Sequence, residues 1–135
     1  MRPSRLLHPT LILLATAAGS VALAHHSTQG IYNEDEIVEL TGTVKQWRFI
    51  NPHPSLTIEV TAPNGEIEEW DVSYGGAAVT HLKGRGYTAG TFMPGEVIVV
   101  RGFAAKVTTA HGLLIRGDPV RQDGSPVVSS PAPSQ

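Results

Sequence analysis

The segment from Ser55 to Tyr74 restricts the fold more than any other part of the sequence. Its first part, SLTIEVTA (Ser55–Ala62), alternates strictly, with Leu, Ile and Val on one face and Thr, Glu and Thr on the other. Asn64 and Gly65 follow, and an Asn-Gly pair between two such runs is a strong short-range signal for a β-hairpin. IEEWDVSY (Ile67–Tyr74) then returns as the partner strand. The pattern therefore predicts a hairpin with one apolar face.

Three more strands and one helix are expected around this hairpin. Glu36–Ile50 is rich in β-branched and aromatic residues, and the glycine in its middle, Gly42, predicts a bulge or tight bend. Ala77–Lys83 has helical spacing before two glycines. A Pro-Gly turn leads into Glu96–Phe103, and His111–Arg116 is the last strand. The chain is thus predicted to be all-β with one short helix. The order of three strands, a helix and two strands favours a small five-stranded OB-like barrel over an open sandwich or roll.

The N-terminus has the features of a secretory signal peptide. Arg2 and Arg5 are followed by a nearly uncharged run rich in Leu and Ala, which closes on the small-residue site Ala22-Leu23-Ala24. The alternative is a transmembrane anchor, because the run is close to the ~20 residues that span a bilayer. His8-Pro9 interrupts it early, which favours cleavage after Ala24. We therefore expect a periplasmic or secreted protein with no membrane insertion after cleavage.

The 135 residues suffice for one domain. Residues 1–24 are predicted to be the signal peptide, 25–35 a polar N-terminal arm and 36–117 the barrel. Residues 118–135 are rich in Pro, Ser, Gly and Asp, which predicts a disordered tail.

Charge and cysteine content exclude several classes of function. Ten Lys and Arg stand against 12 Asp and Glu, and cleavage after Ala24 would remove two of the ten, which changes the net charge from −2 to −4. Such a chain without a basic cluster is not expected to bind nucleic acid. The absence of cysteine excludes disulfides, thiolate metal sites and cysteine nucleophiles. No catalytic constellation is found, so an enzyme is not expected.

Three histidines form a candidate metal site: His25, His26 and His53. After cleavage at Ala24, the α-amine and the ring nitrogen of His25 can chelate one ion together. One further imidazole, from His26 or His53, would complete a T-shaped set of three nitrogens that suits copper(II). Pro52 and Pro54 are expected to hold His53 on a stiff loop. The sequence therefore suggests a copper-binding or metal-handling protein.

Two alternatives to this copper site remain. Cleavage after Ala22 would leave His25 in third position, where it binds copper(II) through the amine, two backbone nitrogens and the ring. The histidine pair can also be solvated and without a role.

A different function is a non-enzymatic binding or accessory module for an organic ligand or a periplasmic protein. Trp47, Trp70 and Tyr74 would then form an aromatic binding face on the sheet, although tryptophans at such positions are more often part of a core. His81 and His111 are expected at the surface.

Five short motifs occur in order along the chain: AHHS around His25, TGTV (Thr41–Val44), NPH (Asn51–His53), EEW (Glu68–Trp70) and PGEVIVVRG (Pro94–Gly102). In this order and spacing they resemble one family of exported bacterial proteins, domain of unknown function 6152. The resemblance covers His25 to about Gly117 and implies a small exported β-barrel. The pattern of the family matches the chain at His25, His26 and His53, and it implies no activity.

Overall fold

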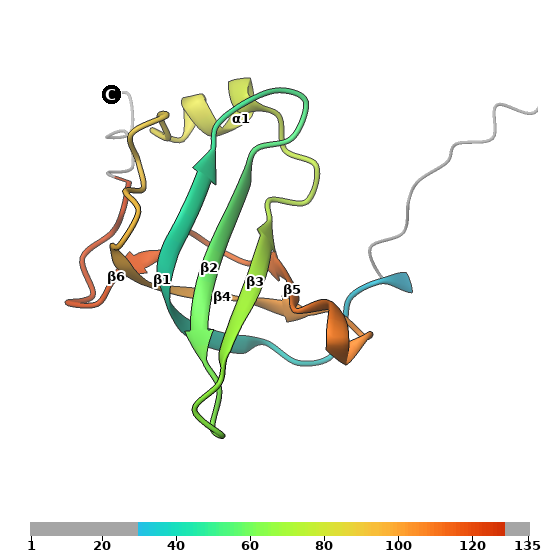
Figure 1. Ribbon diagram of the computed structural model, residues 1–135. Helices are drawn as coiled ribbons and strands as arrows, with labels where there is room; N and C mark the ends of the chain where they lie inside the picture. The colour runs from blue at the N-terminus through green and yellow to red at the C-terminus, as the bar shows by residue number, and fades with distance from the viewer. Residues whose placement is uncertain (1–29, 129–135) are drawn as a thin grey trace, which may run out of the picture.

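The computed structural model describes residues 30–128, which form a closed five-stranded barrel (Figure 1). The elements are β1 (Val38–Arg48), β2 (Ser55–Thr61), β3 (Ile67–Ser73), α1 (Val79–Gly84), β4 (Val97–Ala104), a 3₁₀ turn (Thr108–Ala110), β5 (Gly112–Ile115) and a short β6 (Val120–Arg121). The predicted order of three strands, a helix and two strands is confirmed, with β6 as an addition.

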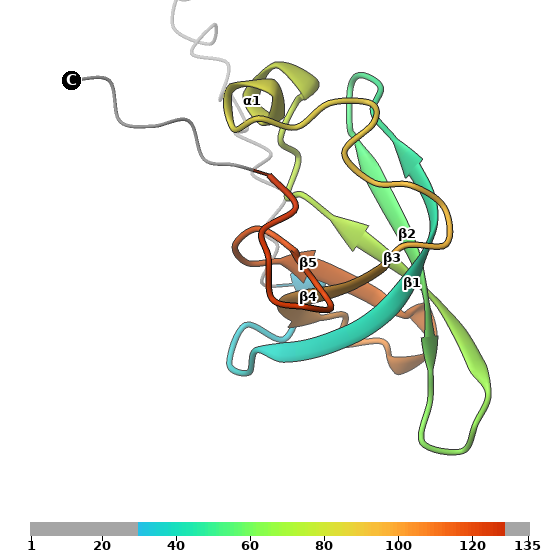
Figure 2. The same cartoon turned by 90° about the vertical axis from the view of Figure 1, so that its left-hand side faces the viewer.

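The barrel closes through the pairing of its first and fourth strands. β1 pairs with β2 and with β4, β3 runs parallel to β5, and β5 pairs with β4, which gives the cyclic order β1-β2-β3-β5-β4. In Figure 1 the first three strands stand upright, and β4 and β5 cross behind them. Figure 2 shows α1 over one end of the barrel and the β2–β3 hairpin projecting from the other. The predicted OB-like barrel is confirmed.

β1 takes part in both halves of the barrel because it bends. Its first half pairs with β4 from Val38 to Thr43, and its second half pairs with β2 from Thr43 to Arg48. Gly42 is buried at the crossing, where a Cβ would lie 3.0 Å from the carbonyl oxygen of Glu59. The irregularity in register lies slightly later, between Val44 and Gln46. The sequence thus correctly predicted a bend in this strand. A glycine occupies position 42 because β2 packs closely against it.

The Asn-Gly hairpin is confirmed, and its turn has three residues. The Gly65 N–H donates to the carbonyl of Ala62, and Gly65 has a φ of 85°. The side-chain oxygen of Asn64 accepts a hydrogen bond from the N–H of Glu66 at 3.0 Å. A type I turn followed by a left-handed glycine is a common way to build such a hairpin.

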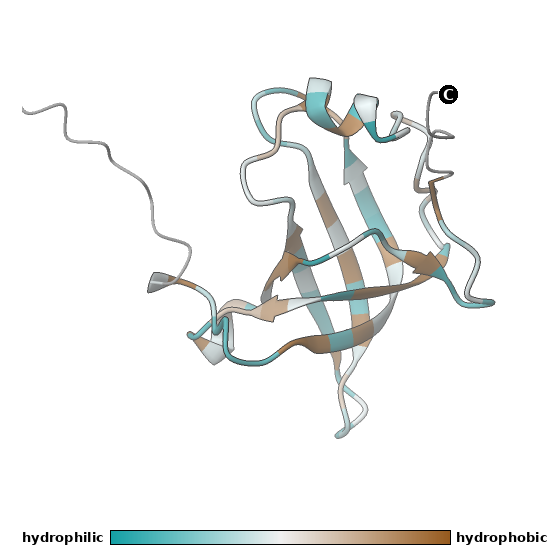
Figure 3. Cartoon of the chain, turned by 180° about the vertical axis from the view of Figure 1, so that it is seen from behind, coloured by the Kyte–Doolittle hydropathy of each residue, from teal (hydrophilic) through white to brown (hydrophobic). Residues whose placement is uncertain are grey.

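The core fills the barrel with the apolar face of each strand. Figure 3 shows hydrophobic residues alternating with hydrophilic ones along the strands. The core residues are Val44, Leu56, Ile58, Val60, Val72, Leu82, Tyr87, Phe92, Ile98, Val100, Leu113, Val127 and Val128. Full burial of such a side chain stabilises the fold by about 1.5–3 kcal/mol. α1 contributes Leu82 and so closes one end.

The predicted disordered tail is wrong for residues 118–128. Val120 pairs with β4, Pro119 is fully buried, and Val127 and Val128 belong to the core. The Arg121 guanidinium fixes the return of this segment, because its Nε donates to Glu96 at 2.9 Å and its Nη1 to the Pro126 carbonyl at 2.7 Å. Few apolar residues suffice here, because Val127 and Val128 pack into the same core as the barrel residues.

The last residues of the predicted arm lie against the barrel. Tyr32 forms an antiparallel bridge with Ala105, and the Lys106 N–H donates to the Ile31 carbonyl at 2.9 Å. The predicted signal peptide, residues 1–24, lies outside the described residues. Within residues 30–128, no helix has the length and apolarity needed to cross a membrane.

Candidate functional site

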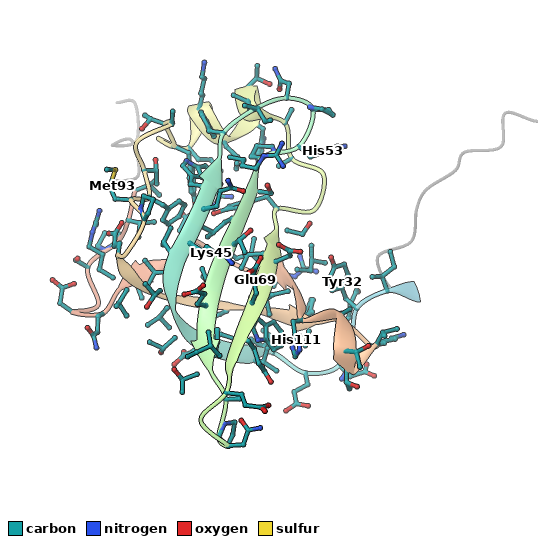
Figure 4. The ribbon with its side chains drawn as sticks, in the orientation of Figure 1. Tyr32, Lys45, His53, Glu69, Met93 and His111 are labelled. Carbon is teal, nitrogen blue, oxygen red and sulfur yellow. The ribbon has the colours of Figure 1, made fainter. Side chains whose placement is uncertain are left out.

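A groove of about 660 Å³ lies on the outward face of β2 and β3. Its borders come from three separate parts of the chain: the β1–β2 loop with His53, the β4–β5 segment with Ala105 and Ala110, and the arm with Ile31 and Tyr32. Figure 4 shows His53 near the upper end of this face and Tyr32 lower down, at the side of the face. Strands 2 and 3 with these two loops form the binding face of OB-folds in general. The groove is therefore the candidate functional site.

The floor of the groove is polar because it is built from the outward positions of the strands. The floor residues are Gln46, Arg48, Ser55, Thr57, Glu69, Asp71 and Ser73. The Thr57 hydroxyl donates to the Asp71 carboxylate at 3.2 Å. Next to the floor, Lys45 forms an ion pair with Glu69, and this contact raises the pKa of the Lys45 ammonium. Hydroxyl, amide, carboxylate and guanidinium groups are thus all available to a ligand.

His53 is the one predicted metal ligand that lies within the described residues. Its side chain is exposed, and the neighbouring Pro54 is buried, which anchors the loop. The Asn51–Pro52 peptide bond before it is cis. His25 and His26 lie outside the described residues. From Gly30 to Val128, no three His, Cys, Asp or Glu side chains are grouped so that they could hold a metal ion.

Trp47 and Tyr74 belong to an aromatic cluster that faces inward. The Trp47 ring lies 5.4 Å from Phe49, 5.7 Å from Tyr74 and 5.1 Å from Phe92, between ring centroids. The indole N–H of Trp47 donates to the Thr88 carbonyl at 2.9 Å. Trp47 and Tyr74 are only half-buried, but they pack against the core.

Tyr87 connects this cluster to the C-terminal segment. Its buried hydroxyl donates to the Asp118 carboxylate at 2.6 Å, and Arg85 donates to the same oxygen at 2.6 Å. Burial, and then the hydrogen bond to Asp118, raise the pKa of Tyr87. Burial also raises the pKa of Tyr74, well above its usual value. Both phenols are therefore held in the neutral form.

Trp70 lies apart from the aromatic cluster. Its ring lies 5.3 Å from the His111 ring, and its indole N–H donates to Glu68 at 3.0 Å. Of the three residues of the predicted aromatic face, Trp47 and Tyr74 therefore lie together. Trp70 packs against His111 instead.

The two histidines predicted to lie at the surface differ. His81 is exposed on α1, as expected. His111 is half-buried, with a left-handed backbone (φ 39°, ψ 46°) and a buried Nδ1 that makes no hydrogen bond. Sequence reasoning missed His111 as a candidate, because its neighbours Trp70 and Glu68 are some forty residues away in the chain.

Comparisons with known proteins identify the family of the chain. The model of a family of unknown function, DUF6152, matches residues 13–116, which covers most of the chain and all five barrel strands. No curated protein matches the chain. The protein therefore belongs to DUF6152.

Proposed function

We propose that this protein is an exported periplasmic metal-binding protein, and that copper is held at the groove by His25, His26 and His53. The observation that carries the proposal is that His53 and the start of the described chain line the same groove. His26 precedes Ile31 by five residues, and five residues reach up to about 17 Å. This reach supports the proposal, because Ile31 and His53 line one groove.

The donor set fits copper(II) better than other ions. An α-amine and imidazoles are nitrogen donors of intermediate softness, and the chain offers no thiolate because it has no cysteine. The Pro-flanked loop would fix one imidazole in advance, which lowers the entropy cost of binding. Asp71 on the groove floor adds a carboxylate nearby, which favours a cation, whereas the charge of Glu69 is paired with Lys45.

Copper titration of the mature chain, His25 to Gln135, followed by EPR tests the metal site. We expect one tight copper(II) site with nitrogen couplings. His53→Ala should remove one nitrogen and weaken binding at least about tenfold. One extra residue before His25 should abolish the chelate of the terminal amine. His81→Ala, on the exposed side of α1, is the matched control and should bind as wild type.

The outcome that contradicts the metal site is a spectrum that neither His53→Ala nor the extra residue changes. Export is tested separately by producing the full chain in a bacterium with a periplasm. We expect the periplasmic fraction to hold a protein with the mass of residues 25–135. A full-length protein in the membrane fraction would contradict export, but it would leave the proposed copper site untested by this experiment and open to the titration.

The second candidate function is binding of a polar organic ligand or a protein partner in the same groove. The polar floor favours it, since guanidinium, carboxylate and hydroxyl groups alternate there. The ligand would then lie on the outward face, not against Trp47, Trp70 and Tyr74. Binding of such a ligand or partner should persist when a chelator is present. If this binding is lost in Arg48→Ala but not in His53→Ala, the result favours this function over copper binding.

A further inference from the structure

A second, smaller cavity lies between β3 and the loop that joins β4 to β5. It has a volume of about 260 Å³, and its polar side chains are Glu68 and Trp70 of β3 and Thr108 and His111 of the loop. The remaining walls are small or apolar, with Ala104, Ala105 and Val107 among them. Figure 4 shows His111 below the groove and away from His53. The cavity adjoins the groove, because Ala105 and Gly112 line both, but its polar side chains do not line the groove proposed for copper.

Glu68 places a carboxylate in this cavity, and no Lys or Arg of the described residues forms an ion pair with it. Its Oε2 accepts the indole N–H of Trp70 at 3.0 Å and lies 3.5 Å from Nδ1 of His111. Among residues 30–128 its ion pair is with His111, which is charged only when protonated. The Glu68 side chain is 32% exposed. A partly desolvated carboxylate of this kind gains from a cationic partner.

His111 is held in an unusual conformation at the cavity wall. Its left-handed backbone is costly for a residue with a side chain, by roughly 1–3 kcal/mol. Its carbonyl accepts the Asp71 N–H at 2.9 Å, and the carbonyl of Gly112 accepts the Ala105 N–H at 2.8 Å, so His111 and the residue after it are fixed to the sheet. Its Nδ1 is buried and makes no hydrogen bond to any residue from 30 to 128. Strain and an unsatisfied polar atom at one cavity are typical of a functional site.

We propose that this cavity binds a small organic ammonium ion. Glu68 supplies the negative charge, and the tilted rings of Trp70 and His111 supply aromatic surface, on which an alkylammonium group is favourable. The small apolar walls fit the carbon part of such a ligand. The volume is below the ~300–1,000 Å³ of drug-sized sites, which restricts the ligand to a few heavy atoms.

Other classes of ligand fit less well. An anion would lie against the Glu68 carboxylate. A metal ion would find only one imidazole and one carboxylate, and the described residues offer no third ligand to complete a site. An uncharged apolar molecule would leave the carboxylate unpaired.

The test is a titration with methylammonium chloride, with sodium chloride at equal ionic strength as the reference and a chelator present to exclude copper. Two-dimensional NMR of the mature chain reports on the indole N–H groups, of which the two tryptophans give one each. We expect a saturable shift of the Trp70 signal. The Trp47 signal should not move, because that indole is bonded to Thr88 in the aromatic cluster.

Two variants of neighbouring residues test whether the Glu68 carboxylate is the group that binds the ammonium ion. Glu68→Gln keeps an oxygen for the Trp70 indole but removes the charge, and we expect at least about tenfold weaker binding. Glu69→Gln removes a charge from the outward face of the same strand and should bind as wild type. The proposal is overturned if sodium chloride alone produces the same shift, if no saturation occurs, or if the two variants lose affinity equally.

Discussion

Gly102 is a residue at which two strands of the barrel meet without space for a side chain. A Cβ there would overlap the carbonyl oxygen of Leu114 in β5, which is backbone and cannot rotate away. We expect Gly102→Ala to lower the free energy of unfolding by about 3 kcal/mol, the upper end of the usual cost of overpacking. Urea unfolding measures this. Gly84→Ala is the control, because, apart from the backbone of its own helix and its chain neighbours, no atom of the described residues lies within 4 Å of its added Cβ.

Tyr87 predicts how stability depends on pH in alkaline solution. Burial and Asp118 raise the pKa of its phenol above the ordinary 10.0, so the folded state binds the proton more tightly than the unfolded state. This contribution to stability is complete below pH 10.0 and is lost as the pH rises above it. Tyr87→Phe should lower the free energy of unfolding by about 1 kcal/mol at neutral pH, because the hydrogen bond to Asp118 is lost.

The same variant should also lose less stability above pH 10.0 than wild type does. Urea unfolding at a series of alkaline pH values measures the two slopes, and the absorbance of tyrosinate reports ionisation. Tyr32→Phe, in the arm, is the control. Equal slopes for wild type and Tyr87→Phe would show that this phenol does not govern alkaline stability.

Local sequence signals predicted the elements of the barrel well where each signal acts within its own element. The Asn64-Gly65 turn was predicted because a left-handed glycine is a local requirement. Gly42 was correctly predicted as the bend of the first strand. A glycine is needed there because β2 approaches closely, and no local sequence pattern reveals this contact. The C-terminal segment was missed because its composition is that of a tail. Its burial depends on a core assembled from residues far away in the chain.

That C-terminal segment is an element on which core closure depends. Val128 is 5% exposed, whereas Val107 in the β4–β5 loop is 64% exposed. We expect Val128→Ala to lower the free energy of unfolding by about 2 kcal/mol, since it removes two buried methyl groups and leaves a cavity. Val107→Ala should change it by less than ~0.5 kcal/mol. Urea unfolding compares the two, and equal effects would mean that residues 118–128 add little to the core.

At the scale of the whole molecule, barrel closure creates the candidate site. The groove joins residues from the arm, both loops and the first three strands, and the parallel pairing of β3 with β5 brings the β4–β5 segment to it. From the sequence, His53 could be selected because Pro52 and Pro54 flank it. The groove itself, and the meeting of Glu68 with His111, depend on contacts between distant segments, so no spacing rule could have found them.

The continuous core also predicts that the molecule unfolds as one unit. Core residues run from Val44 to Val128, and the pairings that close the barrel join distant segments. The two tryptophans report on different regions: Trp47 lies beside Thr88, and Trp70 lies beside His111. In Trp70→Phe and Trp47→Phe, the fluorescence of the remaining tryptophan should give the same urea midpoint as the circular dichroism of that same variant. A fluorescence midpoint below the circular dichroism midpoint for Trp70 alone would instead mean that the β4–β5 loop opens before the barrel does.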